Sequence, residues 1–525
     1  MKQIKLYIVA ISLVVCASLT SCVKDLNVTP IDPNIALPED VLNSEDAYFQ
    51  VLAKCYQGLA CSSTNGPDGS PDIDGVDGGY GQYMRALFNL NTVTTDEATV
   101  CWNDGTLRHL HQMRWTSTNE FNLSMYFRIY YQISLCNEFI RRGSASEFAN
   151  GNNMKLWLGE ARALRALSYY HAIDMYGNVP FATEDQSVGS TGPDQIMRAD
   201  LYKWLVDECK DILTIIPEKA LEYGRASGEM VKMILAKLYL NSMVYTDGAV
   251  NNFAECAQIC REIMTAHPTL EPNYLNLFGA DNDKFDEIIF AVVSEGTNTR
   301  SYGSTNYLIL ASLNGDYVAW KDKMGAVEGW GGLTVTSAFI DKFDKKDARY
   351  TFTDCSEFDP KGEYVHTYVV NDDNTFLSGY CTTKWRNIKS DGTPGNKTNS
   401  TVDTDYPVFR AADAYLMFAE ATLCNGGNAA DAVSAVNVVR KRAGLASLAS
   451  VTLDDILDER GRELYWENFR RSDLIRFGKY VGSDYVWEWK GGVAEGTSVD
   501  AKFKLFPIPA NDINSNSKLT QNAGY

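Results

Sequence analysis

Apolar residues recur every three or four positions through much of the chain, a spacing typical of amphipathic helices. The pattern is clearest at residues 154–175 and stops at Gly177 and Pro180, residue types that end helices. Comparable patterns cover residues 195–216, 228–244, 252–266, 411–424, 429–443 and 453–477. The last of these follows Thr452, a residue type that caps helix N-termini well. The pattern therefore predicts a mostly helical protein.

The predicted helices occur as pairs rich in alanine and tyrosine, similar to tetratricopeptide repeats but without a regular period. The pattern changes between about residues 268 and 405, where residues 287–293 form an apolar run typical of a buried strand. Residues 387–403 are almost entirely polar, as in a solvated loop. We predict a mostly α fold in which a helical frame with tetratricopeptide-like helix pairs carries long loops and minor β structure. Loops on a rigid frame are where binding groups concentrate.

The N-terminus has the three parts of an export signal. Two lysines precede a 14-residue apolar run at residues 6–19, which is too short to span a bilayer core of about 30 Å as a helix. Small residues then lead to Cys22, and this site resembles the bacterial lipobox. We predict that residues 1–21 are a signal peptide, that Cys22 is lipidated and that residues 22–39 are a tether. The alternative is a secreted protein with an unmodified cysteine at this position.

Charge and cysteine content narrow the function classes. The chain has 67 acidic and 48 basic residues, and loss of the leader would change its formal net charge from −19 to −21. This argues against nucleic acid as a partner, because phosphate binding needs clustered Lys and Arg. The 10 cysteines besides Cys16 and Cys22 include no CxxC pair, and the chain has only five histidines. We therefore predict buried core thiols and no metal site.

Eight segments carry further information when they are taken in order. They are residues 160–166, 176–180, 415–421, 436–444, 459–464, 471–476, 506–509 and 521–525. Together with the lipobox-like site at Cys22, they resemble the hallmark stretches of the SusD/RagB family of Bacteroidetes outer-membrane lipoproteins. Arg and Glu on the alanine-rich helices among them are expected to pair with one another, so we interpret these hallmarks as structural and not catalytic.

The resemblance implies a SusD-like architecture in which residues 40–525 form a single compound domain. The N-terminal helical part would cover about residues 40–267, and the C-terminal part, about residues 268–525, would carry the ligand-binding loops. The resemblance also implies a non-catalytic glycan-binding protein, held by its lipid in the outer membrane and facing the cell exterior. Such a protein captures oligosaccharide or polysaccharide for a partner SusC-like TonB-dependent transporter.

A sugar ring offers a flat face of C–H groups and a rim of hydroxyls, so its site needs exposed aromatic rings and planar polar side chains. The best local candidate is Trp102, which is followed by Asn103 and Asp104 in a segment that resembles a family region contributing a platform aromatic. We expect Trp102 to stack on a sugar and Asn103 or Asp104 to bind its hydroxyls. The alternative is a buried Trp102 beside a simple turn.

A second candidate segment lies just upstream and also resembles a family stretch. It supplies Tyr80 and Arg85 as expected glycan contacts, with Tyr83 as an alternative stacking ring. Three aspartates among glycines precede them: Asp72, Asp74 and Asp77. They are candidate Ca²⁺ ligands, although their spacing is not that of an EF-hand. A solvated turn, or carboxylates that bind sugar hydroxyls, is the interpretation that we favour over a metal.

The third candidate region is residues 298–332, which is rich in Gly, Ser and Asn. It holds five aromatic residues: Tyr302, Tyr307, Tyr317, Trp320 and Trp330. Rings in so polar a stretch cannot all belong to the core. We predict that Tyr302 and Trp320 are further stacking rings.

Two other functions compete with glycan binding. A glycoside hydrolase would use two carboxylates about 5–10 Å apart, but no Asp or Glu stands in a recognisable catalytic signature. A tethered helical-repeat scaffold that binds protein or peptide would share the fold and lack the sugar site. New reducing ends from a polysaccharide would identify the first. Loss of glycan binding in a folded Trp102→Ala variant would exclude the second.

Overall fold

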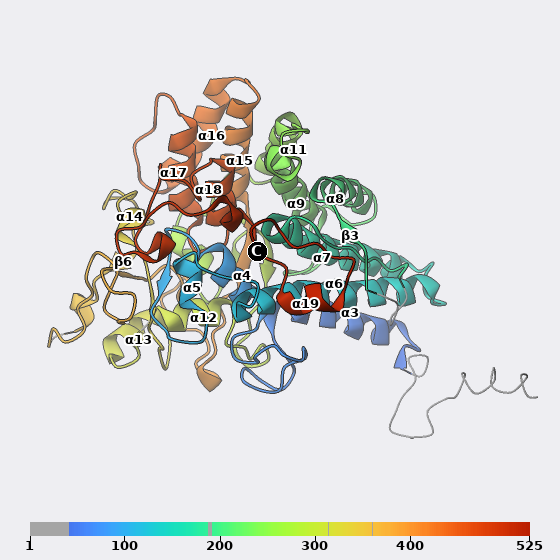
Figure 1. Cartoon of the computed structure of the whole chain (residues 1–525), viewed down its shortest axis with the longest axis horizontal. Coiled ribbons are helices and arrows are strands. Elements are labelled where there is room, and N and C mark those ends of the chain that lie inside the picture. Colours follow the sequence, from blue (N-terminus) through green and yellow to red (C-terminus); the bar gives the residue numbers. More distant parts are fainter. Residues whose placement is uncertain (1–40, 187–191, 313, 360) are drawn as a thin grey trace, which may run out of the picture. The chain divides into compact units, whose positions relative to one another are not determined.

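The computed structural model describes residues 41–186, 192–312, 314–359 and 361–525 (Figure 1). The predicted signal peptide, Cys22 and the predicted tether lie outside these residues. The chain divides into two compact units, residues 1–51 and residues 52–525, and helix α3 (Glu45–Ala60) begins in the first and ends in the second. Among the described residues, no helix is long and apolar enough to cross a membrane. The frame and the sites below belong to the second unit.

The second unit is built on an array of helices in which each packs on the next. Its longer members are α6 (Glu120–Ala145), α7 (Asn152–Tyr176), α8 (Arg198–Ile212), α9 (Gly228–Leu240), α11 (Phe253–Ala266), α15 (Ala411–Cys424), α16 (Ala429–Arg442) and α17 (Leu453–Leu464). Contacts join α6 to α7, α7 to α8, α8 to α9 and α9 to α11, and α15 continues the array by packing on α11 (Figure 1). Helices α16 and α17 then pack on α15. The predicted mostly α frame of paired helices is confirmed.

Shorter helices and turns join these elements. The short α-helices are α4 (Tyr83–Asn91), α5 (Arg108–His111), α10 (Ser242–Tyr245), α12 (Ser304–Ala311), α13 (Val318–Met324), α14 (Ser337–Ile340), α18 (Arg470–Arg476) and α19 (Ala510–Ser515). The 3-10 turns are η1 (Tyr274–Phe278), η2 (Asn282–Lys284), η3 (Ser356–Phe358), η4 (Thr398–Ser400), η5 (Lys490–Gly492) and η6 (Ala501–Lys504).

The β structure of the described residues consists of two-stranded antiparallel pairs. The pairs are β1 (Thr99–Val100) with β5 (Leu333–Thr334), β2 (Val179–Pro180) with β3 (Gln195–Ile196), β4 (Ile288–Val292) with β8 (Tyr406–Arg410), and β6 (Phe352–Thr353) with β7 (Cys381–Thr382). Strands β4 and β8 are buried along their whole length, which confirms the strand predicted at residues 287–293. The other pairs are short, and they fix where long loops begin and end.

Local chemistry explains where several helices begin. The Asn119 side chain accepts a hydrogen bond from the backbone N–H of Asn122 at the start of α6, and Ser227 does the same for Met230 at the start of α9. Thr452 forms a complete capping box with Asp455, in which each side chain accepts from the other residue's backbone N–H. Side-chain caps of this kind satisfy backbone donors that would otherwise lack a partner.

The helix predicted at residues 453–477 is wrong in one respect, because it is two helices, α17 and α18. Between them, Trp466 and Asn468 have positive φ angles of 60° and 70°, which no α-helix accommodates. The Trp466 backbone N–H and indole N–H both donate to Glu97, at 2.9 Å each. The apolar spacing therefore predicted helix correctly on both sides of the break, but contacts with a residue far away in the sequence interrupt the helix between them.

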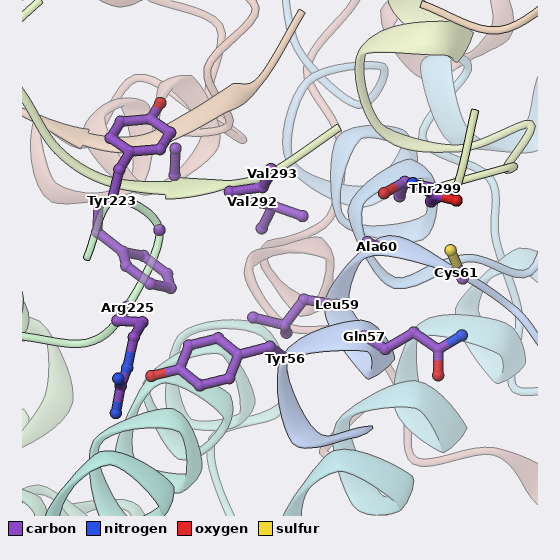
Figure 2. Close-up of a pocket in the computed structure, with 14 residues that line it drawn as sticks. Tyr56, Gln57, Leu59, Ala60, Cys61, Tyr223, Arg225, Val292, Val293 and Thr299 are labelled. Carbon is purple, nitrogen blue, oxygen red and sulfur yellow. The ribbon is translucent and has the colours of Figure 1, made fainter. Parts of the chain in front are cut away.

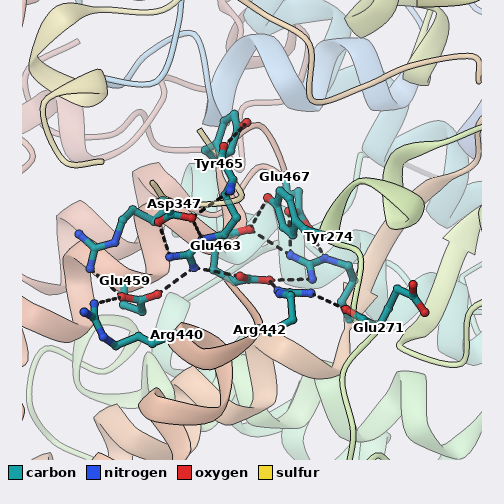
Figure 3. A network of polar contacts seen from close by, with 12 residues as sticks. Glu271, Tyr274, Asp347, Arg440, Arg442, Glu459, Glu463, Tyr465 and Glu467 are labelled. Carbon is teal, nitrogen blue, oxygen red and sulfur yellow. Dashed lines mark hydrogen bonds and ion pairs between the residues drawn. The ribbon is translucent and has the colours of Figure 1, made fainter. Parts of the chain in front are cut away.

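The Arg and Glu residues of the hallmark segments lie in buried ion pairs. On α7, Arg165 pairs with Glu208 at 2.8 Å and Glu160 pairs with Arg225. Around α17 the same arrangement becomes a network, in which Glu459, Glu463 and Glu467 face arginines that include Arg440 and Arg442 (Figure 3). Charges this deeply buried are retained only when they are paired. The structural interpretation of these residues is confirmed.

Asp405, just before β8, is a buried carboxyl that has the carboxylates of Asp283 and Asp403 nearby. Its Oδ1 accepts a hydrogen bond from the Ser294 backbone N–H at 2.7 Å, yet burial raises its pKa from 3.8 to about 7. Because the folded-state pKa exceeds the unfolded one, the free energy of unfolding should fall as pH rises from about 4 through 7.

Asp405→Asn keeps an acceptor oxygen for Ser294 and removes the charge. We expect this variant to be more stable than the parent by about 1–4 kcal/mol at pH 8 and by no more than about 1 kcal/mol at pH 4.5. Denaturant unfolding at the two pH values measures the difference, with the exposed Asp484→Asn as control. The same difference at both pH values would contradict the assignment.

Candidate functional site

Pairing of β1 with β5 brings together two tryptophans that are distant in the sequence. Thr99 lies opposite Thr334 and Val100 opposite Leu333, so the residue pair Trp102 and Trp330 meets at one end of the ladder. The Cys101 backbone N–H donates to the Gly332 carbonyl at 3.0 Å, which extends the pairing toward the rings. The ring centroids of Trp102 and Trp330 are 6.4 Å apart.

Two tyrosines complete this group. Tyr302 meets Trp330 edge-on with 5.3 Å between centroids, and Tyr307 lies 6.0 Å from Trp102. Tyr307 is buried, whereas the other three rings are half-buried and present part of their surface to solvent. We call Trp102, Tyr302 and Trp330 the aromatic cluster.

Arg85 supports the aromatic cluster from within the protein. Its guanidinium lies 4.3 Å from the Tyr307 centroid and 5.7 and 5.9 Å from those of Trp102 and Trp330, distances at which cation–π attraction operates. It also donates to the Tyr302 carbonyl at 3.2 Å. These contacts hold the rings in place. Arg85 is only 9% exposed, so it is not available for the direct glycan contact that was expected from the sequence.

The rings of the aromatic cluster are not coplanar. The planes of Trp102 and Trp330 are inclined by 57°, and those of Tyr302 and Trp330 by 87°. The exposed parts therefore form a bent apolar surface. Because the ring planes point in different directions, a flat chain could not stack on all three rings at once.

Polar groups border the aromatic cluster where the sequence predicted them. Asn103 and Asp104 are exposed, and Arg108 donates to the Asn103 side-chain oxygen at 2.6 Å. Tyr80 is half-buried, and burial together with the nearby carboxylates of Glu120, Asp77 and Asp104 raises its pKa to about 12. These groups supply hydroxyl-binding atoms beside the rings, although their contact with a glycan stays a prediction.

Trp320 was predicted as a stacking ring, and the structure shows that this is wrong. It is 1% exposed on α13 and packs edge-on against Phe358 at 4.6 Å. Trp330, from the same candidate region, occupies the position in the aromatic cluster that was predicted for Trp320. A signal was present in the sequence, because Trp320 has Met324 one helical turn later, whereas Trp330 stands between Gly329 and Gly331.

The three aspartates proposed for calcium have different surroundings. Asp72 accepts from Arg128 at 2.7 Å and pairs with Lys54 at 3.4 Å, while Asp77 accepts from the backbone N–H groups of a turn. Asp74 is exposed. Within the described residues, the carboxylate oxygens of these three aspartates do not lie close enough together to bind one cation. Calcium at this segment stays a prediction.

A hollow of about 350 Å³ adjoins the aromatic cluster. Trp330 forms part of its wall, together with Asn314, Asp316, Tyr364 and Phe376. Phe376 is 49% exposed, so the hollow has apolar surface as well as polar groups. Its position gives a ligand on Trp330 room to extend beyond the rings.

A separate hollow of about 270 Å³ lies between α3 and β4 (Figure 2). Its best-placed polar groups are already used, since the Tyr56 hydroxyl and the Arg225 guanidinium both bond to Glu160. Val292 and Val293 form much of the remaining wall. It contains none of the residues predicted for the glycan site, although Tyr223, which is 39% exposed, also lines it.

A frame of paired helices that holds half-exposed aromatic rings on its loops defines a helical-repeat binding protein. Comparison with known proteins identifies the family. The model of the SusD family matches residues 286–525. Starch-binding protein SusD of Bacteroides thetaiotaomicron is 32% identical over an alignment that covers 100% of this chain and 99% of that protein. The chain belongs to the SusD family.

Solved structures support the fold. Surface glycan-binding protein A from Bacteroides uniformis is 22% identical with a TM-score of 0.71, covering 91% of this chain and 100% of that one. Surface glycan-binding protein A from Bacteroides thetaiotaomicron, in complex with laminarihexaose, gives 20% identity and a TM-score of 0.71, covering 91% and 99%. At these identities the likeness concerns the fold alone.

Proposed function

We propose that this protein is a non-catalytic, cell-surface glycan-binding lipoprotein that captures oligosaccharide or polysaccharide on the aromatic cluster. The observation that carries the proposal is the bent surface of Trp102, Tyr302 and Trp330 with exposed Asn103 and Asp104 at its border. Rings bind the C–H faces of sugars, and planar polar side chains bind the hydroxyls.

The comparisons support a glucan as the ligand. A relative aligned over the whole chain is named a starch-binding protein, and a structural neighbour was solved with laminarihexaose. Starch chains and laminarin chains both curve, as the inclined rings require, whereas cellulose chains are flat. A curved glucan is therefore the proposed ligand class.

The test is calorimetry and affinity electrophoresis of the mature protein with maltoheptaose, laminarihexaose and cellohexaose, and with the parent polysaccharides. We expect at least one of the curved glucans to bind and cellohexaose to bind at least tenfold more weakly. Binding of none of them would overturn the glucan proposal. New reducing ends in the same samples would overturn the non-catalytic part and favour a glycoside hydrolase.

The setting of the protein is part of the proposal. A lipid on Cys22 would hold it in the outer membrane facing the exterior, and residues 22–39 would let it reach a SusC-like TonB-dependent transporter that receives the glycan. Membership of the SusD family supports this arrangement. Purification of the lipidated chain from its own membrane tests it, since a transporter of that class should purify with it and its absence would count against delivery.

A further inference from the structure

We propose that Cys355, His366 and Cys381 form a binding site for a thiophilic divalent cation of the Zn²⁺ type. The three side chains are buried, and one potential ligand atom from each lies within 4.8 Å of the others. No metal site was predicted from the sequence, because the chain has no CxxC pair and only five histidines, and these three residues are 11 and 15 positions apart. They meet only in the folded protein.

The backbone around β6 and β7 brings the three residues together. Thr353 on β6 pairs with Cys381 on β7, and Cys355 follows two residues after Thr353. The His366 backbone N–H donates to the Asp354 carbonyl at 2.9 Å, which draws the middle of the intervening loop back to the strands. Cys355 itself has a φ of +67°, an uncommon conformation for a residue with a side chain.

The histidine is oriented as metal ligands are. Its Nδ1 lies 2.9 Å from the Gly379 carbonyl, an atom that can only accept, so Nδ1 carries the proton and Nε2 keeps its lone pair. A hydrogen bond from the second ring nitrogen to a carbonyl is the usual way to fix a ligating imidazole. Cys355 and Cys381 are both free cysteines.

The ligand atoms are close to the spacing of a tetrahedral site, although one side chain must turn to complete it. Zn–S bonds of about 2.3 Å and Zn–N bonds of about 2.0 Å place sulfur and nitrogen roughly 3.5 Å apart. The Cys381 Sγ lies 3.6 Å from His366 Nε2 and 3.8 Å from Nδ1, so it stands over the ring, and the Cys381 side chain must rotate before its sulfur and Nε2 can share one cation. Two thiolates balance the charge of a divalent cation, and binding would release the two thiol protons to solvent. A disulfide between Cys355 and Cys381 would not explain why the imidazole of His366 is held in this orientation.

The site has an open side. His366 and Cys381 line the hollow of about 350 Å³ that Trp330 also lines, so a water or a ligand atom can take the fourth position. The loop between the two cysteines supplies Tyr364, Phe376 and Leu377 to the same hollow. A bound cation would therefore hold this wall in place. The inference concerns these residues alone and stands whether or not the chain binds a glucan.

The experiment uses the reduced mature protein loaded with Zn²⁺ or Co²⁺. We expect about one equivalent of metal per chain, with thiolate-to-cobalt charge-transfer absorption that Zn²⁺ abolishes. Cys355→Ser, Cys381→Ser and His366→Gln should each weaken Co²⁺ binding at least tenfold, and Cys424→Ser, a half-buried cysteine elsewhere, should bind as the parent does. Zn²⁺ should raise the melting temperature of the parent and not of the three variants.

Parent protein without the charge-transfer absorption would overturn the proposal, as would unchanged Co²⁺ binding by the three variants. A Cys355–Cys381 disulfide that persists in protein produced with excess Zn²⁺ would also overturn it. Where a variant fails to fold, peptide mapping after alkylation of the folded parent decides. Zn²⁺ should then protect Cys355 and Cys381 and leave the labelling of Cys424 unchanged.

Discussion

Trp330→Ala should weaken glucan binding by about 2 kcal/mol, roughly 30-fold, without unfolding the protein. Trp330 is the central ring of the aromatic cluster, because it contacts both Trp102 and Tyr302 and also lines the adjoining hollow. Its loss removes stacking area and separates the two remaining rings. Since Trp330 is half-buried, the cost to folding should be much smaller than the cost to binding.

Calorimetry with the curved glucan that binds best measures this effect, and Trp102→Ala should act in the same direction. The matched control is Trp204→Ala on α8, a half-buried tryptophan that contacts Tyr169 and Phe181 on the helical frame. Equal losses in the control and in Trp330→Ala would mean that binding follows general stability, and unchanged affinity in Trp330→Ala would remove the cluster from the site.

Glu463→Gln should lower the free energy of unfolding by about 3–5 kcal/mol, the cost of breaking a buried ion pair. The Glu463 carboxylate faces three guanidinium groups, those of Arg349 at 3.1 Å, Arg410 at 3.0 Å and Arg442. Although burial opposes ionisation, these groups hold the pKa of Glu463 well below its usual range. A neutral amide would leave their charges less balanced in the interior.

Urea unfolding at pH 7 measures this loss, and the matched control is Asp454→Asn. Asp454 pairs with Lys479 at 2.6 Å but is exposed, so its loss should cost less than about 1 kcal/mol. Because the folded-state pKa of Glu463 is depressed, its stabilisation is present above about pH 4.5 and is lost as pH falls below that value. The gap between parent and Glu463→Gln should therefore close in acid. A gap independent of pH would contradict the role given to the charge.

The helical frame could be predicted from the sequence because local signals and tertiary packing agree there. Apolar spacing located the helices, and Thr452 marked a start that the capping box confirms. The break between α17 and α18 could not be predicted in this way, since it depends on hydrogen bonds from Trp466 to Glu97, far away in the sequence.

In the candidate site, too, the residues with local sequence signals could be predicted, and those brought together by long-range pairing could not. Trp102 and Tyr302 could be selected because rings in polar loops have few buried places to go. The choice between Trp320 and Trp330 depended on which ring the β1–β5 pair brings beside Trp102, and a short two-residue pairing leaves no periodic trace. The meeting of Cys355, His366 and Cys381 was hidden for the same reason, because β6 and β7 are equally short.

The most direct test of glycan capture by the aromatic cluster is a crystal structure of the mature chain with its best-binding curved glucan. We expect successive sugar rings to lie on Trp102 and Trp330, with Tyr302 beside them and hydroxyls within hydrogen-bond distance of Asn103 or Asp104. Density for the glucan in the hollow lined by Tyr56 and Val292, with the aromatic cluster left bare, would contradict the account.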